Sequence, residues 1–220
     1  MYLWALALLV ELCSCAHTAQ TWTAGIFLDR QRPEDREVAT IPRPLIPDGI
    51  MLTKRFEQFR SGLYNDAAHF CTIAYGHLIE RFPCNGSEST EFISGVTEER
   101  GSELLSADMT IAQRAVMRAL PNSALTDQQF AALCDFVFNV GGDKFAGSTL
   151  HLVVERGEFS RVAPELRRWV LAGGQYQRGL EKRREAEIAL FFTGIPRPVE
   201  RPSDIFSPKI DILIGESTTT

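Results

Sequence analysis

The chain has 220 residues, of which 45% are hydrophobic and 23% are charged, with a formal net charge of −5. These values exclude a wholly disordered, collagen-like or coiled-coil chain, and they exclude a global basic field for nucleic acid. The five cysteines are too few for a disulfide scaffold and lack the paired spacing of a zinc site.

Residues 1–16 form a signal-like apolar segment. Leu3–Val10 is wholly apolar and Glu11 interrupts the run, which is too short for a membrane-spanning helix but suits the core of a secretory signal. Small residues for cleavage follow at Ser14–Ala16, whereas no Lys or Arg precedes Asp29. We expect export to the periplasm or the cell exterior. The alternative is a wrongly assigned start or a weak anchor, which keeps the protein cytoplasmic.

Proline-containing segments divide the rest of the chain. Residues 17–47 are polar and contain four prolines, which is typical of a linker. Residues 195–220 contain four more and are expected to form a tail, in which Ile210–Ile214 can add one short strand. The folded part is therefore expected at residues 48–194, a suitable size for a single domain.

The first expected elements are a helix and a small sheet. Asp48 is a candidate helix cap, Gly62 is a candidate stop, and four apolar residues between them follow the spacing of one helix face: Leu52, Phe56, Phe59 and Leu63. Residues 63–79 break this period and are rich in Tyr, Phe, Thr and Ile, which predicts a hairpin sheet. Residues 81–95 are typical of a loop.

Four further helical patterns follow in the chain. The first begins at Thr97 and ends before Pro121, and the second begins with a capping box at Thr126–Gln129. Apolar stripes in Val162–Val170 and Leu180–Phe192 predict the last two. A small β lobe followed by a helical lobe gives an α+β fold, with a ligand cleft expected between the lobes.

The candidate chemistry lies where the two lobes join. Glu57 is expected on the first helix, near its end, Asp66 follows nine residues later, and Thr72 follows six residues after that. Two carboxyl groups facing each other across a cleft suit glycoside hydrolysis, in which one acts as an acid and the other as a carboxylate. A carboxyl group beside aromatic side chains can keep its proton because burial disfavours the charged form, and a hydroxyl group can hold a water molecule.

Several motifs in order resemble those of the phage-type lysozymes, glycoside hydrolase family 24. Thr72–His77, with the sequence Thr-Ile-Ala-Tyr-Gly-His, closely resembles the family's Thr-Ile-Gly-Tyr-Gly-His run, which follows a Glu and an Asp at these spacings. Four later segments match further motifs of that family: Phe136–Gly141, Ser148–Leu150, Trp169–Gly174 and Gly179–Glu187.

The resemblance implies a role for each site residue. Glu57 is similar to the family's proton donor, and Asp66 to the carboxylate that positions the attacking water or stabilises the transition state. Thr72 is similar to the hydroxyl that helps to hold this water. Leu78 and Phe138 match positions that line the sugar cleft.

The activity implied by the resemblance is hydrolysis of the β-1,4 bond between N-acetylmuramic acid and N-acetylglucosamine in peptidoglycan, with bacteriolysis as the result. Peptidoglycan glycan strands are the expected partner. No metal, cofactor, nucleic acid or obligate protein partner is implied, and a monomer is expected. Two rivals stay open, namely a lytic transglycosylase of the same fold and a catalytically inactive peptidoglycan-binding protein.

The sequence departs from the family pattern at three places. Ala74 replaces a usual glycine, and the turn at residues 67–70 lacks the usual Pro or Gly. Residues 81–95 are an apparent insertion, which a Cys71–Cys84 disulfide would tie to the sheet in an exported protein.

Simpler interpretations also stay open for several residues. Glu57 can be a solvated helix residue, Asp66 an ordinary turn residue and Thr72 a plain strand residue. His77 is expected to be structural. Residues 156–184 contain eight Lys or Arg and three Asp or Glu, so they form either a basic face for polyanionic cell wall or ordinary solvated helix surface.

Overall fold

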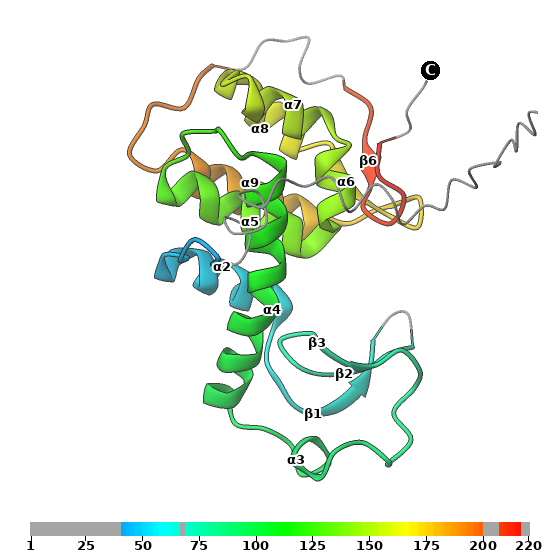
Figure 1. Ribbon diagram of the computed structural model, residues 1–220. Helices are drawn as coiled ribbons and strands as arrows, with labels where there is room; N and C mark the ends of the chain where they lie inside the picture. Colours follow the sequence, from blue (N-terminus) through cyan, green and yellow to red (C-terminus); the bar gives the residue numbers. More distant parts are fainter. Residues whose placement is uncertain (1–40, 67–68, 200–206, 217–220) are drawn as a thin grey trace, which may run out of the picture. The chain divides into compact units, whose positions relative to one another are not determined.

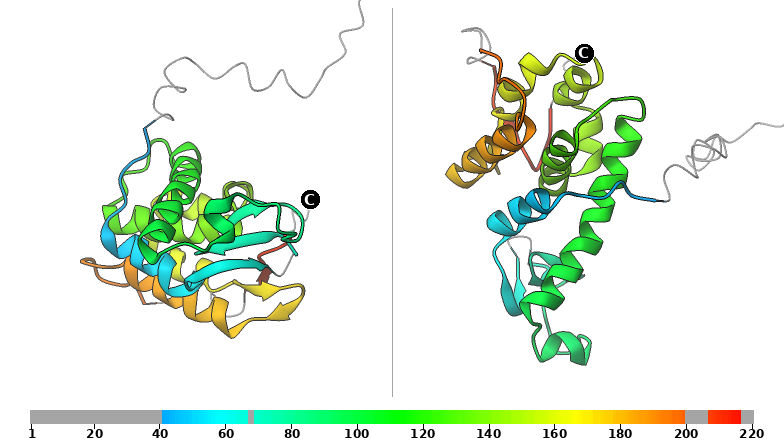
Figure 2. Two further views of the ribbon diagram at one scale, coloured as in Figure 1. Left: turned by 90° about the horizontal axis from the view of Figure 1, so that it is seen from below. Right: turned by 90° about the vertical axis from the view of Figure 1, so that its left-hand side faces the viewer.

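The computed structural model describes residues 41–66, 69–199 and 207–216, so the signal-like segment 1–16 and most of the linker lie outside the described residues. The fold is α+β, as predicted, with a small antiparallel sheet below a lobe of packed helices (Figure 1). Helix α4 (Glu98–Ala119) contacts both the small sheet and the helical lobe, and it runs along the molecule from one to the other (Figure 2). None of the helices in the described ranges has the length and apolar character needed to span a membrane.

The first helix is shorter than predicted. Helix α2 (Pro47–Glu57) ends at Glu57, and the next residue, Gln58, adopts a φ of 57°, so the expected continuation to a stop at Gly62 is wrong. Phe59 and Leu63 pack instead against the apolar core of the small lobe. The conformation of residues 58–63 is therefore set by burial of their apolar side chains in the sheet lobe, although the spacing of these side chains also fits a helix.

The small sheet has three antiparallel strands in the order β1–β2–β3. These are β1 (Arg60–Asn65), β2 (Cys71–Ala74) and β3 (His77–Glu80), which confirm the small hairpin sheet expected over residues 63–79 and begin it three residues earlier. Ala74, the residue that departs from the family's glycine, has a φ of 58° and is fully buried. This left-handed backbone conformation strains a residue with a Cβ atom, which accounts for a glycine at this position in the family.

The helical lobe packs around α5. Thr126 and Gln129 form the predicted capping box, and the Thr97 side chain caps α4 as expected. Helix α5 contacts α2, α4 and α9, and its free Cys134 is buried as part of the core. The helices of the described residues other than α2 and α4 are α3 (Thr90–Ile93), α5 (Asp127–Val140), α6 (Gly142–Ala146), α7 (Thr149–Glu155), α8 (Val162–Leu166) and α9 (Arg178–Phe191), with one 3₁₀ turn, η2 (Phe159–Arg161).

The single helix expected over Val162–Val170 is wrong. Helix α8 ends at Leu166, and β4 (Trp169–Ala172) begins a second small sheet with the order β5–β4–β6. Gly173 and Gly174 both have positive φ and form the two-residue turn to β5 (Gln175–Tyr176). Such a turn favours Gly-Gly because both central residues need positive φ, so the glycines mark a hairpin rather than a helix end.

Two outlying segments are attached to the domain. Cys71 and Cys84 form a disulfide that ties the insertion to β2. Strand β6 (Ile210–Asp211) lies within the predicted Ile210–Ile214 strand and pairs in parallel with β4, and Ile210 is buried in the main core.

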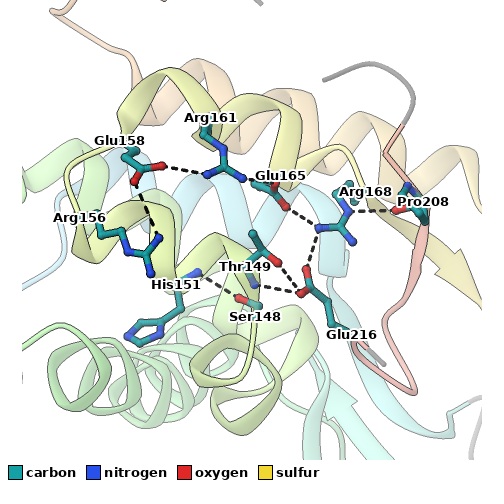
Figure 3. Close-up of polar contacts among 10 residues, drawn as sticks. All are labelled: Ser148, Thr149, His151, Arg156, Glu158, Arg161, Glu165, Arg168, Pro208 and Glu216. Carbon is teal, nitrogen blue, oxygen red and sulfur yellow. Dashed lines mark hydrogen bonds and ion pairs between the residues drawn. The ribbon is translucent and has the colours of Figure 1, made fainter. Parts of the chain in front are cut away.

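The basic residues of 156–184 do not form a free basic face. Several are held in ion pairs along the helical lobe, for example Arg161 with Glu158 and Glu165, and Arg168 with Glu165 (Figure 3). Arg183 and Arg184 are themselves buried. The interpretation of this stretch as a wall-adsorbing surface is therefore not supported.

Candidate active site

Glu57 is held at the C-terminal end of α2 by an ion pair that the sequence did not predict. Its side chain is 23% exposed, and its Oε1 atom accepts a hydrogen bond of 2.6 Å from Nη1 of Arg183 on α9. Its Oε2 atom faces Gly76, where the Cβ atom of any larger residue would lie 3.7 Å from it. The two carboxyl oxygens therefore face different surroundings.

Arg183 is itself fixed by a buried carboxylate. Its Nε and Nη2 atoms donate hydrogen bonds of 2.9 Å and 3.0 Å to the two oxygens of Asp135 on α5, which is fully buried. Thr53 on α2 donates a further hydrogen bond of 2.7 Å to Asp135. Burial alone would raise the pKa of Asp135, but the charge of Arg183 and these hydrogen bonds hold it below its ordinary value. The guanidinium that contacts Glu57 through Nη1 is thus held in place by Asp135 through Nε and Nη2.

A second layer lies behind Arg183. Arg184 and Glu187 on α9 are fully buried, and Nη2 of Arg184 donates hydrogen bonds to Glu187 and to Asn139. Burial raises the pKa of Glu187 well above its ordinary value, while the charges of Arg184 and Arg183 oppose this rise. Glu187 Oε1 also lies 3.7 Å from Nε of Arg183, so this second layer contacts the guanidinium that pairs with Glu57.

Asp66 and Thr72 lie at the turn between β1 and β2. Asp66 Oδ1 accepts a hydrogen bond of 2.8 Å from the Phe70 amide, and the Asp66 amide donates to the Phe70 carbonyl. The Thr72 hydroxyl donates to the same carbonyl at 3.0 Å, and Thr72 is 3% exposed. The carboxylate of Asp66 thus also closes this turn, which explains how the turn forms without a Pro or Gly.

Tyr64 connects the two carboxylates electrostatically. It lies opposite Thr72 in the β1–β2 ladder. Burial raises the pKa of the Tyr64 phenol, Arg60 lowers it, and the charges of Glu57 and Asp66 raise it further. Glu57 and Asp66 are therefore both within electrostatic range of the Tyr64 phenol.

Two hollows are adjacent to Glu57. The first, of about 440 Å³, includes Gly76 and the predicted sugar-lining residues Leu78 and Phe138. The second, of about 400 Å³, includes Glu57 and the following residues: Phe56, Asn139, Ala172, Gln177, Gly179, Leu180, Arg183 and Ile212. Within the described residues, Asp66 and Thr72 are not part of the lining of either hollow. Glu57 lines the second hollow, and its Oε2 atom lies beside Gly76, a lining residue of the first, so this carboxyl group is adjacent to both. We refer to the two hollows together as the cleft.

His77 has the structural role expected of it. Its Nδ1 atom lies within hydrogen-bond distance, 2.8 Å, of Oδ2 of Asp108 on α4, a polar contact between the small sheet and the long helix. Asp108 also lines the first hollow. The pair therefore holds β3, and with it Leu78, against the helix that forms the opposite wall.

The sequence reasoning missed Arg183 and Tyr64 as site residues. Arg183 belongs to the Gly179–Glu187 motif, and the signal was the presence of two adjacent arginines on a buried helix face, which require buried partners. Tyr64 carried no comparable signal, because a tyrosine in a strand is ordinary.

Comparisons with known proteins show the family to which the chain belongs. The phage lysozyme family matches residues 54–187. The endolysin of Bacillus phage B103 is 35% identical over 156 residues, and the endolysin of Salmonella phage P22 is 32% identical over 148 residues. The match covers 70% of this chain and 56% of the B103 protein, and 66% of this chain and 96% of the P22 protein. The chain thus spans little more than half the length of the B103 endolysin.

A solved structure shows the same fold. The muramidase domain of SpmX from Asticcacaulis excentricus superposes with a TM-score of 0.59 and 29% sequence identity. The superposition covers 68% of this chain and 97% of that domain.

Proposed function

Since the chain belongs to the phage lysozyme family, we propose that it is a lysozyme that hydrolyses the β-1,4 bond between N-acetylmuramic acid and N-acetylglucosamine in bacterial peptidoglycan. The observation that carries this proposal is the position of Glu57, which lines the second hollow and lies beside Gly76 of the first. A glycan strand lying along both hollows places one glycosidic bond beside this carboxyl group.

Each site residue has a role in the proposed reaction. Glu57 donates its proton to the glycosidic oxygen of the leaving sugar, while Arg183 holds the other carboxyl oxygen in place. Asp66 positions the attacking water or stabilises the positive charge that develops on the sugar, and Thr72 helps to hold the water. Leu78 and Phe138 bind the sugar in the first hollow through apolar contacts.

The test is the release of soluble fragments from purified bacterial cell walls. Removal of the general acid in Glu57→Gln is expected to lower the rate by about 10²- to 10⁴-fold. Glu103→Gln is the matched control, because Glu103 is a 67% exposed residue of α4 whose variant is expected to stay within about twofold of the wild-type rate. Equal rates for the Glu57→Gln and wild-type proteins would instead support an inactive binding protein.

Mass spectrometry of the products separates hydrolysis from transglycosylation. Hydrolysis adds one water to each cleaved bond and leaves a reducing N-acetylmuramic acid end. Anhydromuramic ends in the products would refute the hydrolase assignment and support the lytic transglycosylase.

We further propose that the protein acts outside the cytoplasmic membrane, because its substrate lies there, and that residues 1–16 direct export. These residues lie outside the described part of the chain, so the proposal depends on their apolar sequence. Fractionation of cells that express the full-length protein tests it, and recovery solely in the cytoplasm would contradict export.

A further inference from the structure

The C-terminal residues 207–216, called here the C-terminal strap, are built into the helical lobe. Strand β6 of the strap pairs with β4, and the amides of Ile210 and Ile212 donate hydrogen bonds to the carbonyls of Arg168 and Leu171. Ile210 is 4% exposed and belongs to the main core. The strap lies beyond residues 54–187, the part of the chain that matches the family.

Asp211 fastens the middle of the strap to the β4–β5 turn. Its Oδ2 atom accepts a hydrogen bond from the Gly174 amide, and its Oδ1 atom accepts one of 2.8 Å from the Leu213 amide. These backbone donors lower the pKa of the Asp211 carboxyl group, so it is ionised at neutral pH. The turn and the strap are thereby held together as one unit.

Glu216 fastens the end of the strap to the helical lobe (Figure 3). It accepts hydrogen bonds from the Thr149 amide and hydroxyl at 3.0 Å and 2.7 Å, and one of 3.0 Å from Arg168. Arg168 also donates a hydrogen bond of 3.0 Å to the carbonyl of Pro208, at the start of the strap. One guanidinium therefore contacts both ends of the strap.

Between these attachments, Ile212 lines the second hollow together with Glu57 and Arg183. Its side chain is half-buried against the main core, whereas the neighbouring Leu213 is 65% exposed and lines neither hollow. The strap thus supplies one apolar side chain to the wall of the cleft on the Arg183 side of Glu57.

We propose that Ile212 is a substrate-binding residue that contacts the sugar on the Arg183 side of the cleaved bond, and that Asp211 and Glu216 are its positioning residues. The proposal rests on the proposed function above. The second hollow combines apolar side chains with the amide groups of Asn139 and Gln177. This combination suits an N-acetylated sugar, whose C–H faces and acetyl methyl group pack on apolar surface while its hydroxyl and amide groups form hydrogen bonds.

The test is steady-state kinetics with soluble, uncross-linked glycan strands prepared from peptidoglycan. Ile212→Ala is expected to raise KM about three- to tenfold and to change kcat less than about twofold, because the contact is made in both the ground state and the transition state. Leu213→Ala is the matched control, since it removes a comparable aliphatic side chain from the same strap on its exposed side. It is expected to leave both constants within about twofold of wild type.

The positioning role has its own readout. Glu216→Gln is expected to raise KM in the same direction as Ile212→Ala, and the double variant is expected to show less than the product of the two single effects, because both act through one contact. Ile212→Val removes a single methylene group and is expected to give a smaller rise in KM. This variant allows KM to be measured even if Ile212→Ala is too unstable to assay.

The outcomes separate this inference from the proposed function. Equal KM values for the Ile212 variants and Leu213→Ala would overturn the inference while the loss of activity in Glu57→Gln still supported the lysozyme. An unchanged rate in Glu57→Gln would overturn the proposed function, and the inference with it.

Discussion

The substitution Asp135→Asn tests whether the buried carboxylate beneath the active site stabilises the fold. It replaces a fully buried group that accepts two hydrogen bonds from Arg183 and one from Thr53. An amide of the same shape has one oxygen and an NH₂ group that faces a donor of Arg183. Among the described residues, the positive charge of Arg183 then keeps its ion pairs with Glu57 and Glu187 and its position over the Phe56 ring.

The expected loss is about 3–5 kcal/mol of the free energy of unfolding, the usual cost of removing one partner of a buried ion pair. For a domain of this size, 1 kcal/mol corresponds to about 2–4 °C in the melting temperature. The variant should therefore melt roughly 6–20 °C below the wild type in a circular dichroism scan. Asp127→Asn is the matched control, because Asp127 also pairs with an arginine, Arg43, but is 59% exposed, and its loss should stay below about 1 kcal/mol.

The effect also has a predicted pH dependence. The folded state holds the pKa of Asp135 below its ordinary value. The contribution of its carboxylate to the free energy of unfolding is therefore present above the pKa of the unfolded state and is lost as the pH falls through the pKa of the folded state. The difference in the free energy of unfolding between the wild type and Asp135→Asn is therefore constant between about pH 5 and 7 and becomes smaller below about pH 4. This reasoning would be refuted if Asp135→Asn lowered the free energy of unfolding no more than Asp127→Asn does. It would also be refuted if the difference in this free energy between the wild type and Asp135→Asn increased as the pH falls.

Three further predictions concern the two lobes. Loss of the Cys71–Cys84 disulfide, by reduction or by the double Ser variant, should lower the free energy of unfolding by about 3 kcal/mol in urea titrations, since the bond closes a loop across 13 positions of the chain; an unchanged midpoint would count against it. Gly101→Ala should cost about 1–3 kcal/mol, because its Cβ atom would lie 2.7 Å from the Phe59 ring, and wild-type stability would show that the ring moves away freely. Thr126→Ala should cost about 1 kcal/mol by removing the cap of α5, and a change below about 0.3 kcal/mol in the same titration would contradict that role.

Features that depend on neighbouring residues could be predicted from the sequence. The capping box at Thr126, the cap at Thr97 and the α+β succession of elements were predicted, because caps and periodic apolar faces are local signals. The motif around Thr72 likewise led to the lysozyme family, which matches residues 54–187. The Gly173–Gly174 turn carried an equally local signal, but the apolar spacing around Trp169 suggested a helix and concealed it.

How Glu57 is held, and what surrounds it, depends on the packing of distant segments. Arg183 lies 126 positions away from Glu57 in the chain, and only the packing of α9 against α2 and α5 joins the two charges. The same packing places Ile212 of the C-terminal strap in the wall of the cleft. The local sequence shows which residues carry carboxyl groups. The partners of a buried charge depend instead on long-range packing, because a charge that is removed from water needs a compensating group, and tertiary packing decides which group lies beside it.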